Sequence, residues 1–350
     1  MKNEKVGLTI KNFRGIKEGS LKLGKVNILI GGNNSGKTTI LESLFLLPNP
    51  FRPAPCYLEG RGQLSALEVL SSMHSTLGSE ASIFLFHYYN GGIATINFEE
   101  KELGEVSLRF DMTKGDEIKV HIEDASITPR EFIGLGELRK ESPPPRLHSV
   151  HPSIIKFRSR IDEAVFFHPS LLGLVCEYLR NRWVNLRASG LTAVVAQKIS
   201  EAVGAEFDDL LLEPFIGGSQ TIYFRDRRGR GVRFGDVGSG SQVFAALALL
   251  YEHIKPALLL IDDIESHMNP SLLTYVTSWL ADVVKDTKLF VSTHSLEAAK
   301  IIAGVLEDYN PIIKLLELRE GVLKSKDLTL EEVEELEKAG IDIRQRGILL

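Results

Sequence analysis

The chain carries the stretch VNILIGGNNSGKTTILESLFLL from Val26 to Leu47, and this stretch decides the fold class. It begins with five residues that suit a buried strand and ends in an apolar segment that favours a helix. Between them, four residues fit the pattern G-x-x-x-x-G-K-[ST] in its required strand-to-helix context: Gly31, Gly36, Lys37 and Thr38. The sequence therefore predicts a phosphate-binding loop in an α/β fold.

The residue types of this loop suit a nucleotide. Glycines permit a tight turn whose N–H groups surround phosphate oxygens, and the helix N-terminus adds its positive end. We expect Lys37 to reach the β and γ phosphates and Thr38 to offer its hydroxyl to magnesium. The alternative, a glycine-rich turn with a stray lysine, would have to explain four residue types that coincide with the strand-to-helix context.

A second stretch, LLLIDDIESHMNP from Leu258 to Pro270, is an apolar run that ends on acidic residues. Such a run is typical of a buried strand in a parallel sheet, and ligands bind beyond the carboxyl ends of these strands. Acids placed there indicate a metal ion or a reactive water. Together with the phosphate loop, Asp262 is the expected magnesium carboxylate.

The bulk composition is that of an ordinary globular protein, with 350 residues, 43% hydrophobic and 25% charged. The net charge of -5 gives no overall attraction to polyanions, so any nucleic-acid contact needs a local basic patch. Cys56 and Cys176 stand in no metal-ligand or disulfide spacing and are expected to be free thiols. The N-terminus lacks a signal-peptide pattern and no apolar run has membrane length, so we expect a cytoplasmic protein.

The chain alternates between sheet-like and helix-like regions. Residues 6–30 predict three strands, and residues 83–123 predict an antiparallel meander that begins with IFLFHYY. Between 126 and 214, the proline-rich SPPPRLHSVHP precedes segments of helical period, which predicts a helical insertion; His148 and His151 in it are interpreted as loop residues. Strand and helix then alternate from 221 onward, as in a parallel α/β sheet.

These motifs together resemble a known family. GGNNSGKTT is similar to the phosphate loop of ATP-binding-cassette (ABC) type ATPases, and IKNFRGI resembles the strand that opens RecF-like, OLD-like and structural-maintenance-of-chromosomes (SMC) type heads. Ser239 to Gln242 stand where such proteins carry their signature sequence. LLLIDDIESHMNP and VSTHS resemble the acidic block and the switch-histidine strand of the OLD-like group. The resemblance covers roughly residues 6–50 and 220–345, in the family's order.

The resemblance implies an ABC-type ATPase head of the P-loop NTPase fold, with a mixed sheet, an antiparallel β subdomain and a helical insertion. The head would comprise residues 1–125 and 215–350, and the insertion residues 126–214. Its cofactors would be ATP and Mg²⁺, and each ATP would be sandwiched in a homodimer. Ser239 and Gly240 would then contact the γ-phosphate held by the other protomer.

The resemblance also assigns candidate residues to three roles. The magnesium ligands would be Thr38, Asp262 and, as the glutamine of a loop after the first helix, Gln63. The catalytic residues would be Asp263, Glu265 and His294. The nucleotide-binding residues would be Arg14, Gly31, Asn33, Asn34, Ser35, Gly36, Lys37, Thr38, Thr39, Ser239, Gly240, Ser241 and Gln242.

Three of these assignments have structural alternatives. Asn33 is also a suitable turn residue, and Arg14 could form a surface ion pair instead of approaching the nucleotide. His294 could be a structural histidine.

The two remaining acids depart from the family pattern. Asp263 stands where most relatives carry the glutamate that polarises the attacking water, and it is one methylene shorter, so slow turnover is expected. Glu265 matches the second acid of the family block and would assist catalysis or shape the dimer interface. Asn269 replaces a histidine.

Two function hypotheses follow. The first is an ATP-hydrolysing switch that dimerises head to head and acts on DNA or a partner nuclease in repair, recombination or defence. The second is an ATP-sensing regulator with negligible turnover that acts through an effector protein. The chain after His294 is too short for the nuclease domain of OLD-like proteins. A basic string is either a solvated hairpin or a DNA-facing patch: Arg225, Arg227, Arg228, Arg230 and Arg233.

Overall fold

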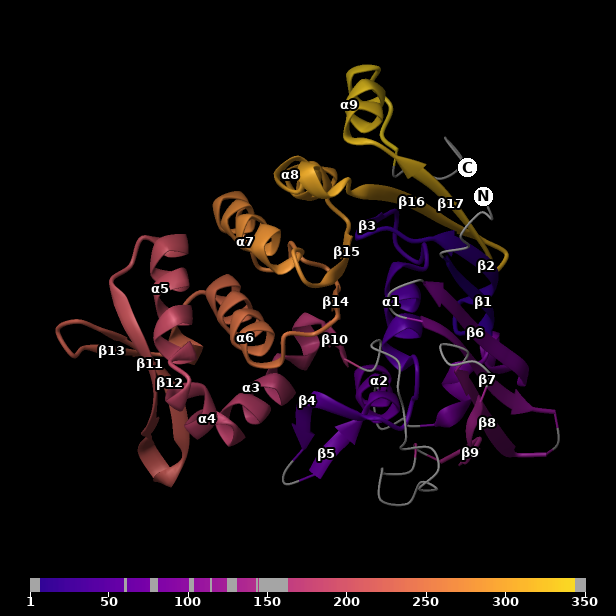
Figure 1. Ribbon diagram of the computed structural model, residues 1–350, viewed down its shortest axis with the longest axis horizontal. Coiled ribbons are helices and arrows are strands. Elements are labelled where there is room, and N and C mark those ends of the chain that lie inside the picture. The colour runs from indigo at the N-terminus through magenta and orange to yellow at the C-terminus, as the bar shows by residue number, and fades with distance from the viewer. Residues whose placement is uncertain are drawn as a thin grey trace.

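The computed structural model describes residues 7–59, 62–75, 81–100, 104–113, 115–124, 131–142, 144 and 163–343. A twelve-stranded sheet runs through this part of the chain, in the order β10-β14-β15-β3-β16-β17-β2-β1-β6-β7-β8-β9. One half of the sheet is parallel and the other half is antiparallel (Figure 1). The predicted α/β class with a mixed sheet and an antiparallel β subdomain is confirmed.

The parallel half has five strands: β10 (Ala164–Phe167), β14 (Leu258–Ile261), β15 (Lys288–Thr293), β3 (Val26–Ile30) and β16 (Ile312–Arg319). Every neighbouring pair among them is parallel. β3 and β14 are buried at each residue, which explains their unbroken aliphatic sequences. Because parallel strands end at the same edge of the sheet, the segments that follow β3, β10, β14 and β15 meet there.

The antiparallel half continues from β16 through strands that turn back on their neighbours. These strands are β17 (Val322–Leu328), β2 (Ile16–Lys22), β1 (Gly7–Phe13), β6 (Gly92–Glu100), β7 (Gly104–Met112), β8 (Glu117–Asp124) and β9 (Glu131–Arg139). Only β17 and β2 pair in parallel within this half. The three strands predicted between residues 6 and 30 are confirmed as β1, β2 and β3.

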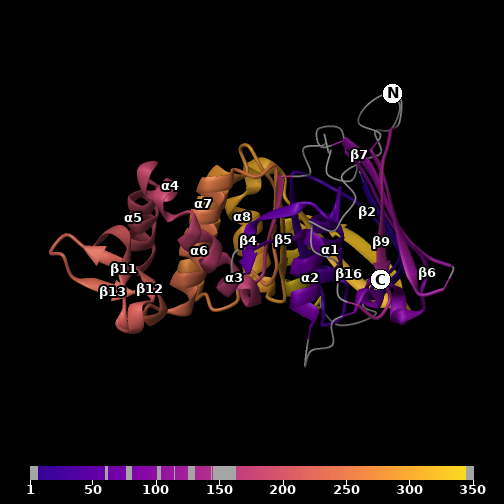
Figure 2. The same cartoon turned by 90° about the horizontal axis from the view of Figure 1, so that it is seen from below.

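Helices cover the sheet and connect its strands. Helix α1 (Lys37–Leu46) lies between the parallel strands and the meander, and most of its residues are buried (Figures 1 and 2). Near it lie α2 (Ala66–His74) and the hairpin of β4 (Pro53–Glu59) and β5 (Gly62–Ser65). The remaining helices of the head are α6 (Ser239–Ile254), α7 (Pro270–Val283), α8 (Leu296–Val305) and α9 (Leu330–Lys338).

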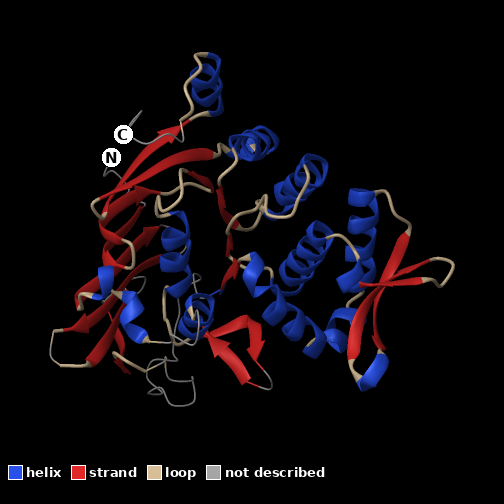
Figure 3. Ribbon diagram, turned by 180° about the vertical axis from the view of Figure 1, so that it is seen from behind, coloured by secondary structure: helices blue, strands red, loops and turns tan. Residues whose placement is uncertain are grey.

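A lobe of helices and strands forms the end of the molecule that lies opposite the meander (Figure 3). It contains α3 (Leu172–Asn181), α4 (Trp183–Ala188), α5 (Leu191–Val203) and a three-stranded antiparallel sheet of β11 (Phe207–Pro214), β12 (Gln220–Asp226) and β13 (Gly231–Arg233). Helix α5 packs against β11 and α6. None of the helices in the described ranges has the length and apolar character needed to cross a bilayer.

The structure differs from two sequence expectations. IFLFHYY is not a strand: it forms the 3-10 turns η2 (Ser82–Leu85) and η3 (His87–Tyr89), and only Phe86 forms an isolated bridge, with Phe13. Two consecutive tyrosines with left-handed backbone, Tyr88 and Tyr89, prevent extended pairing.

The region 126–214 is helical only in its centre. β9 extends the meander, β10 joins the parallel core and β11 belongs to the end lobe, so strands flank helices α3 to α5. The cause is that β10 is a four-residue apolar run whose pairing partner, β14, lies far along the chain. His148 and His151 lie outside the described residues.

Candidate functional site

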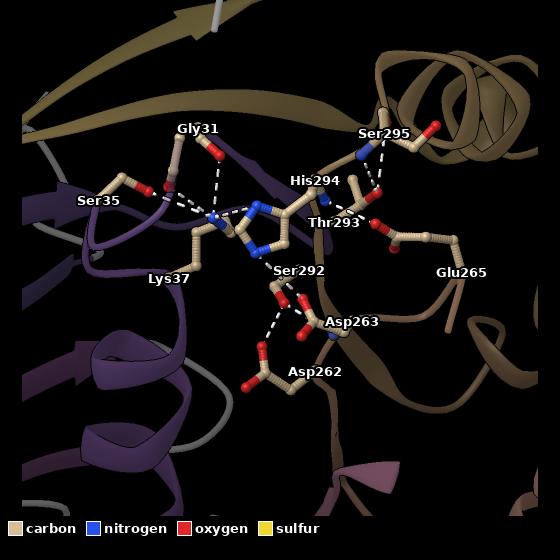
Figure 4. A network of polar contacts seen from close by, with 11 residues as sticks. Gly31, Ser35, Lys37, Asp262, Asp263, Glu265, Ser292, Thr293, His294 and Ser295 are labelled. Carbon is tan, nitrogen blue, oxygen red and sulfur yellow. Dashed lines mark hydrogen bonds and ion pairs between the residues drawn. The ribbon is translucent and has the colours of Figure 1, made fainter. Parts of the chain in front are cut away.

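The phosphate loop joins β3 to α1, and its lysine turns back into the loop (Figure 4). Lys37 Nζ donates hydrogen bonds to the carbonyls of Gly31 at 2.9 Å and Gly32 at 3.0 Å. A Cβ on Gly31 would lie 2.5 Å from the carbonyl oxygen of Leu316, and Gly36 has a φ of 94°, so both positions require glycine. The loop is therefore shaped around the lysine ammonium.

Lys37 is a buried cation among acids. Its residue is 4% exposed, and desolvation lowers the pKa of the ammonium, whereas the charges of Asp263, Asp262 and Glu265 act in the opposite direction. The arrangement concentrates one positive and three acidic groups at the carboxyl edge of the sheet. A phosphate chain in the loop would place its negative charge directly against the ammonium.

Asp262 follows β14 and has one carboxyl oxygen without a partner. Its backbone N–H donates to the carbonyl of Phe167 at 2.9 Å, and its Oδ1 accepts a hydrogen bond from the hydroxyl of Ser292. Burial raises the pKa of the carboxyl, while hydrogen bonds from Ser292 and Thr38 lower it. Oδ2 is buried and accepts no hydrogen bond of normal geometry from any residue in the described ranges.

Thr38 and Asp262 fit a magnesium ion. Magnesium is bound through one or two carboxylates with phosphate and water oxygens, and the unpartnered Oδ2 is a suitable acceptor beside the Thr38 hydroxyl. The described residues contain no group of three His, Cys, Asp or Glu side chains placed to hold a metal, so phosphates and water would complete the shell. Gln63 lies on β5 and donates to the carbonyl of Ala54 at 3.0 Å, so its metal role stays a prediction.

His294 links the lysine to the second aspartate. Its Nδ1 lies 3.4 Å from Lys37 Nζ, and its Nε2 lies 3.5 Å from Asp263 Oδ1 (Figure 4). Asp263 adopts a left-handed φ of 49°, and its N–H donates to the hydroxyl of Ser292 at 2.9 Å. The side chains of His294 and Asp263 remain partly exposed, at 42% and 33%. Water and a phosphate can therefore reach both.

Glu265 has a different position from Asp263. Its Oε1 accepts a hydrogen bond from the backbone N–H of His294 at 2.7 Å, and its Oε2 is buried with no hydrogen-bond partner among the residues described. Glu265 thus holds the end of β15, whereas Asp263 faces the imidazole ring. The structure separates a backbone-holding acid from a ring-facing acid.

Comparison with known proteins assigns a family. Residues 26–299 match the family described as "AAA domain, putative AbiEii toxin, Type IV TA system", which spans most of the chain. The chain belongs to this AAA family. The match confirms the predicted recognition of an AAA-type ATPase with a nucleotide-binding fold.

Solved structures of similar fold are SMC heads. The SMC head domain from Thermotoga maritima is 14% identical, with a TM-score of 0.44, and the match covers 92% of this chain and 98% of that one. An SmcHead bound to the C-winged helix domain of ScpA gives 14%, 0.49, 94% and 98%. An Smc head with an extended coiled coil bound to the C-terminal domain of ScpA derived from Pyrococcus furiosus gives 12%, 0.48, 95% and 98%. No curated protein matches the sequence.

The signature residues of this AAA domain open α6. Ser239 is exposed, and Gly240 is packed so that a Cβ there would lie 2.6 Å from the carbonyl oxygen of His267. Gln242 Nε2 donates to the carbonyl of Val237 at 2.8 Å. Within the described ranges, neither these residues nor Ser241 hydrogen-bonds to the phosphate loop of the same protomer. The start of α6 is instead tied to the loop that follows Asp263.

The other loop residues of the AAA domain divide by exposure. Asn33 and Asn34 are exposed, and Asn34 has a left-handed φ of 59°. Ser35 is buried, with its hydroxyl 3.4 Å from Lys37 Nζ. Thr39, in the first turn of α1, is half-buried. These positions leave the two asparagines accessible to a ligand.

Arg14 is engaged by a neighbouring acid. Its Nε lies 2.9 Å from Oε2 of Glu42, a fully buried residue of α1, and Glu42 Oε1 lies 2.5 Å from His74 Nε2. The Arg14 guanidinium also lies 5.5 Å from the ring centroid of Phe84. The ion-pair alternative for Arg14 is therefore the observed one, although the pair is buried. A nucleotide contact by Arg14 stays a prediction.

His168 is a site residue that the motifs do not single out. It follows β10, whose Phe167 carbonyl binds the N–H of Asp262, and its charge lowers the pKa of Asp262. Nδ1 accepts a hydrogen bond from the N–H of Ser170 at 3.1 Å, so the neutral ring carries its proton on Nε2. A signal was available, because AVFF ends on His168 as LLLI ends on Asp262.

The basic string forms a hairpin between β12 and β13, and much of its charge is paired. Arg230 lies 2.7 Å from Asp226, Arg233 lies 2.5 Å from Asp236, and Arg225 lies 3.8 Å from Glu213. Two arginines form no ion pair with any acid in the described part of the chain: Arg227 and Arg228. The free positive charge is therefore concentrated at the hairpin turn.

Proposed function

We propose that the protein is a molecular switch that binds ATP with magnesium and hydrolyses it slowly. The observation that carries this proposal is the line of contacts from Lys37 through His294 to Asp263, beside the buried carboxyl of Asp262. A phosphate-binding cation, a histidine and an accessible carboxylate are the groups that phosphoryl transfer to water requires.

In the proposed reaction, Lys37 exchanges its bonds to loop carbonyls for bonds to phosphate oxygens and stabilises the transferred phosphoryl group. Thr38 and Asp262 would hold magnesium, whose charge offsets that of the phosphates. Asp263 accepts the proton of the attacking water, and His294 orients that water or bonds to the γ-phosphate. The short side chain of Asp263 reaches the water less well than glutamate would, which makes turnover slow.

The proposal includes an ATP-dependent homodimer. Ser239 is exposed at the first residue of α6, where free N–H groups and a hydroxyl suit an anion. We place Ser239 and Gly240 of one protomer against the γ-phosphate bound by its partner, with Ser241 and Gln242 supporting that contact. Hydrolysis would release the dimer and move the end lobe of α3 to α5.

The output of the switch would be DNA or a partner nuclease in repair, recombination or defence. The family description, which names a type IV toxin–antitoxin system, supports a role in defence. The alternative is an ATP sensor with negligible turnover that acts through an effector protein.

A phosphate-release assay separates the two candidates. The wild-type protein is expected to release phosphate from ATP only when magnesium is present, and to elute as a dimer with ATP in size-exclusion chromatography with light scattering. ATP binding without phosphate release, with or without DNA, would favour the sensor. A protein that stays monomeric with ATP would remove the trans contact of Ser239 from the proposal.

A DNA contact would depend on the unpaired arginines at the hairpin turn. The double variant Arg227→Glu and Arg228→Glu is expected to abolish measurable DNA binding, because the slope of affinity against salt concentration depends on about 0.9 ions per phosphate contact. Charge reversal of the paired Arg233 is the control and should have a smaller effect. Fluorescence anisotropy over a salt series measures both, and unchanged binding by the double variant would remove DNA from this hairpin.

A further inference from the structure

Two adjacent tyrosines of η3 are exposed and hold an unfavourable backbone conformation. Tyr88 is 76% exposed and Tyr89 is 66% exposed, and their φ angles are 46° and 60°. Left-handed backbone is costly for a residue with a bulky side chain, and exposed rings gain little from burial to offset that cost. Such a conformation in exposed aromatic residues points to a role other than packing.

The tyrosine loop is anchored to the turn between β1 and β2. His87 is buried, and its Nδ1 donates to the carbonyl of Arg14 at 3.0 Å. Asn12 donates to the carbonyl of Gly91 at 2.8 Å on the other side of the tyrosines. The ring of His87 lies 4.4 Å from that of Tyr88, centroid to centroid, and supports it from behind. The surroundings therefore hold both rings outward.

The β1–β2 turn also borders the phosphate loop. The side chain of Ile16, the first residue of β2, lies 3.6 Å from the position of a Cβ on Gly36, at the start of α1. The N–H of Lys17 donates to the carbonyl of Gly321 at 2.8 Å, beside the ring of His87. Only one turn thus separates the tyrosines from the end of the phosphate loop.

We propose that Tyr88 and Tyr89 form the surface on which the adenine of the bound ATP stacks. An aromatic ring stacks on a base through its π face, with little preference among bases. Arg14, the nearest cation in the same turn, is held by Glu42 and Phe84, which leaves the tyrosines as the groups exposed to a base. The inference rests on the proposed ATP binding at Lys37.

Calorimetry with two ligands tests the assignment. The variant with both Tyr88→Ala and Tyr89→Ala is expected to bind magnesium-ATP about 5- to 150-fold more weakly than wild type. Its affinity for inorganic tripolyphosphate, which has no base, is expected to be unchanged. Variants with phenylalanine should retain ATP affinity. Ile216→Ala, at an exposed apolar residue of the end lobe, is the control and should bind both ligands normally.

The outcomes distinguish this inference from the proposed function. Unchanged ATP affinity in the double alanine variant would overturn the base-stacking role alone. Equal weakening of ATP and tripolyphosphate would also overturn it, because the phosphate loop itself would then be damaged. Failure of the wild-type protein to bind either ligand would overturn the proposed function as well.

A glycine variant separates function from structure. Glycine adopts left-handed backbone without strain, so Tyr89→Gly is expected to keep or raise the midpoint of thermal unfolding while it weakens ATP binding. A structural role would give the opposite result, with a lowered midpoint and unchanged ATP affinity.

Discussion

Asp263→Asn is expected to lower the rate of ATP hydrolysis about 10²- to 10⁴-fold and to leave ATP affinity unchanged. The reason is that an amide cannot accept the proton of the attacking water, while Lys37 and the phosphate loop are not altered. Asp263 is the acid whose carboxylate faces the ring of His294, at 3.5 Å. Single-turnover phosphate release measures the rate, and calorimetry measures the affinity.

Glu265→Gln is the matched variant for this test. A glutamine can still accept the hydrogen bond from the N–H of His294, so hydrolysis is expected to fall less than in Asp263→Asn. The reverse result, with normal turnover in Asp263→Asn and none in Glu265→Gln, would show that the base lies two residues further along the chain.

Lys37→Met is expected to lower ATP affinity about 100-fold or more. Two charge-assisted hydrogen bonds to phosphate, each worth about 1.5–3 kcal/mol, would be lost, and every 1.4 kcal/mol is about a factor of ten. Methionine keeps most of the buried volume, so the head should still fold. Titration calorimetry with magnesium-ATP measures the change.

Lys314→Met is a control for burying an apolar side chain in place of a lysine. Lys314 is also buried, its ammonium lies 2.7 Å from Asp327 Oδ1, and burial lowers its pKa. This variant should change thermal stability and leave ATP affinity intact, since Lys314 makes no contact with the phosphate loop among the described residues. Equal losses of ATP affinity in both variants would mean that the effect of Lys37 is not specific.

Local pattern predicted the central elements of the site. The strand β3, the loop from Gly31 to Gly36 and helix α1 were predictable because glycine, lysine and threonine stand at fixed spacing between a buried strand and a helix. The run LLLI before Asp262 likewise predicted β14. Such patterns are local, so neighbouring residues specify them without help from the rest of the chain.

Elements whose partners are distant in sequence were not predictable in the same way. AVFF became the parallel strand β10 because it pairs with β14, far along the chain, and this pairing brings His168 beside Asp262. IFLFHYY has the composition of a strand, yet anchoring to the β1–β2 turn holds Tyr88 and Tyr89 in left-handed turns. Tertiary contacts override propensity in both cases.

The sequence by itself determined the phosphate loop, the acidic strand end and the AAA class, because each depends on spacing within one short segment. Only the tertiary structure decided what each acid does. Asp263 faces His294 and Glu265 holds its backbone because β14 and β15 are parallel neighbours, and this pairing places residues about thirty positions apart within hydrogen-bonding distance. Distances between segments depend on the packing of the whole sheet, which no local pattern contains.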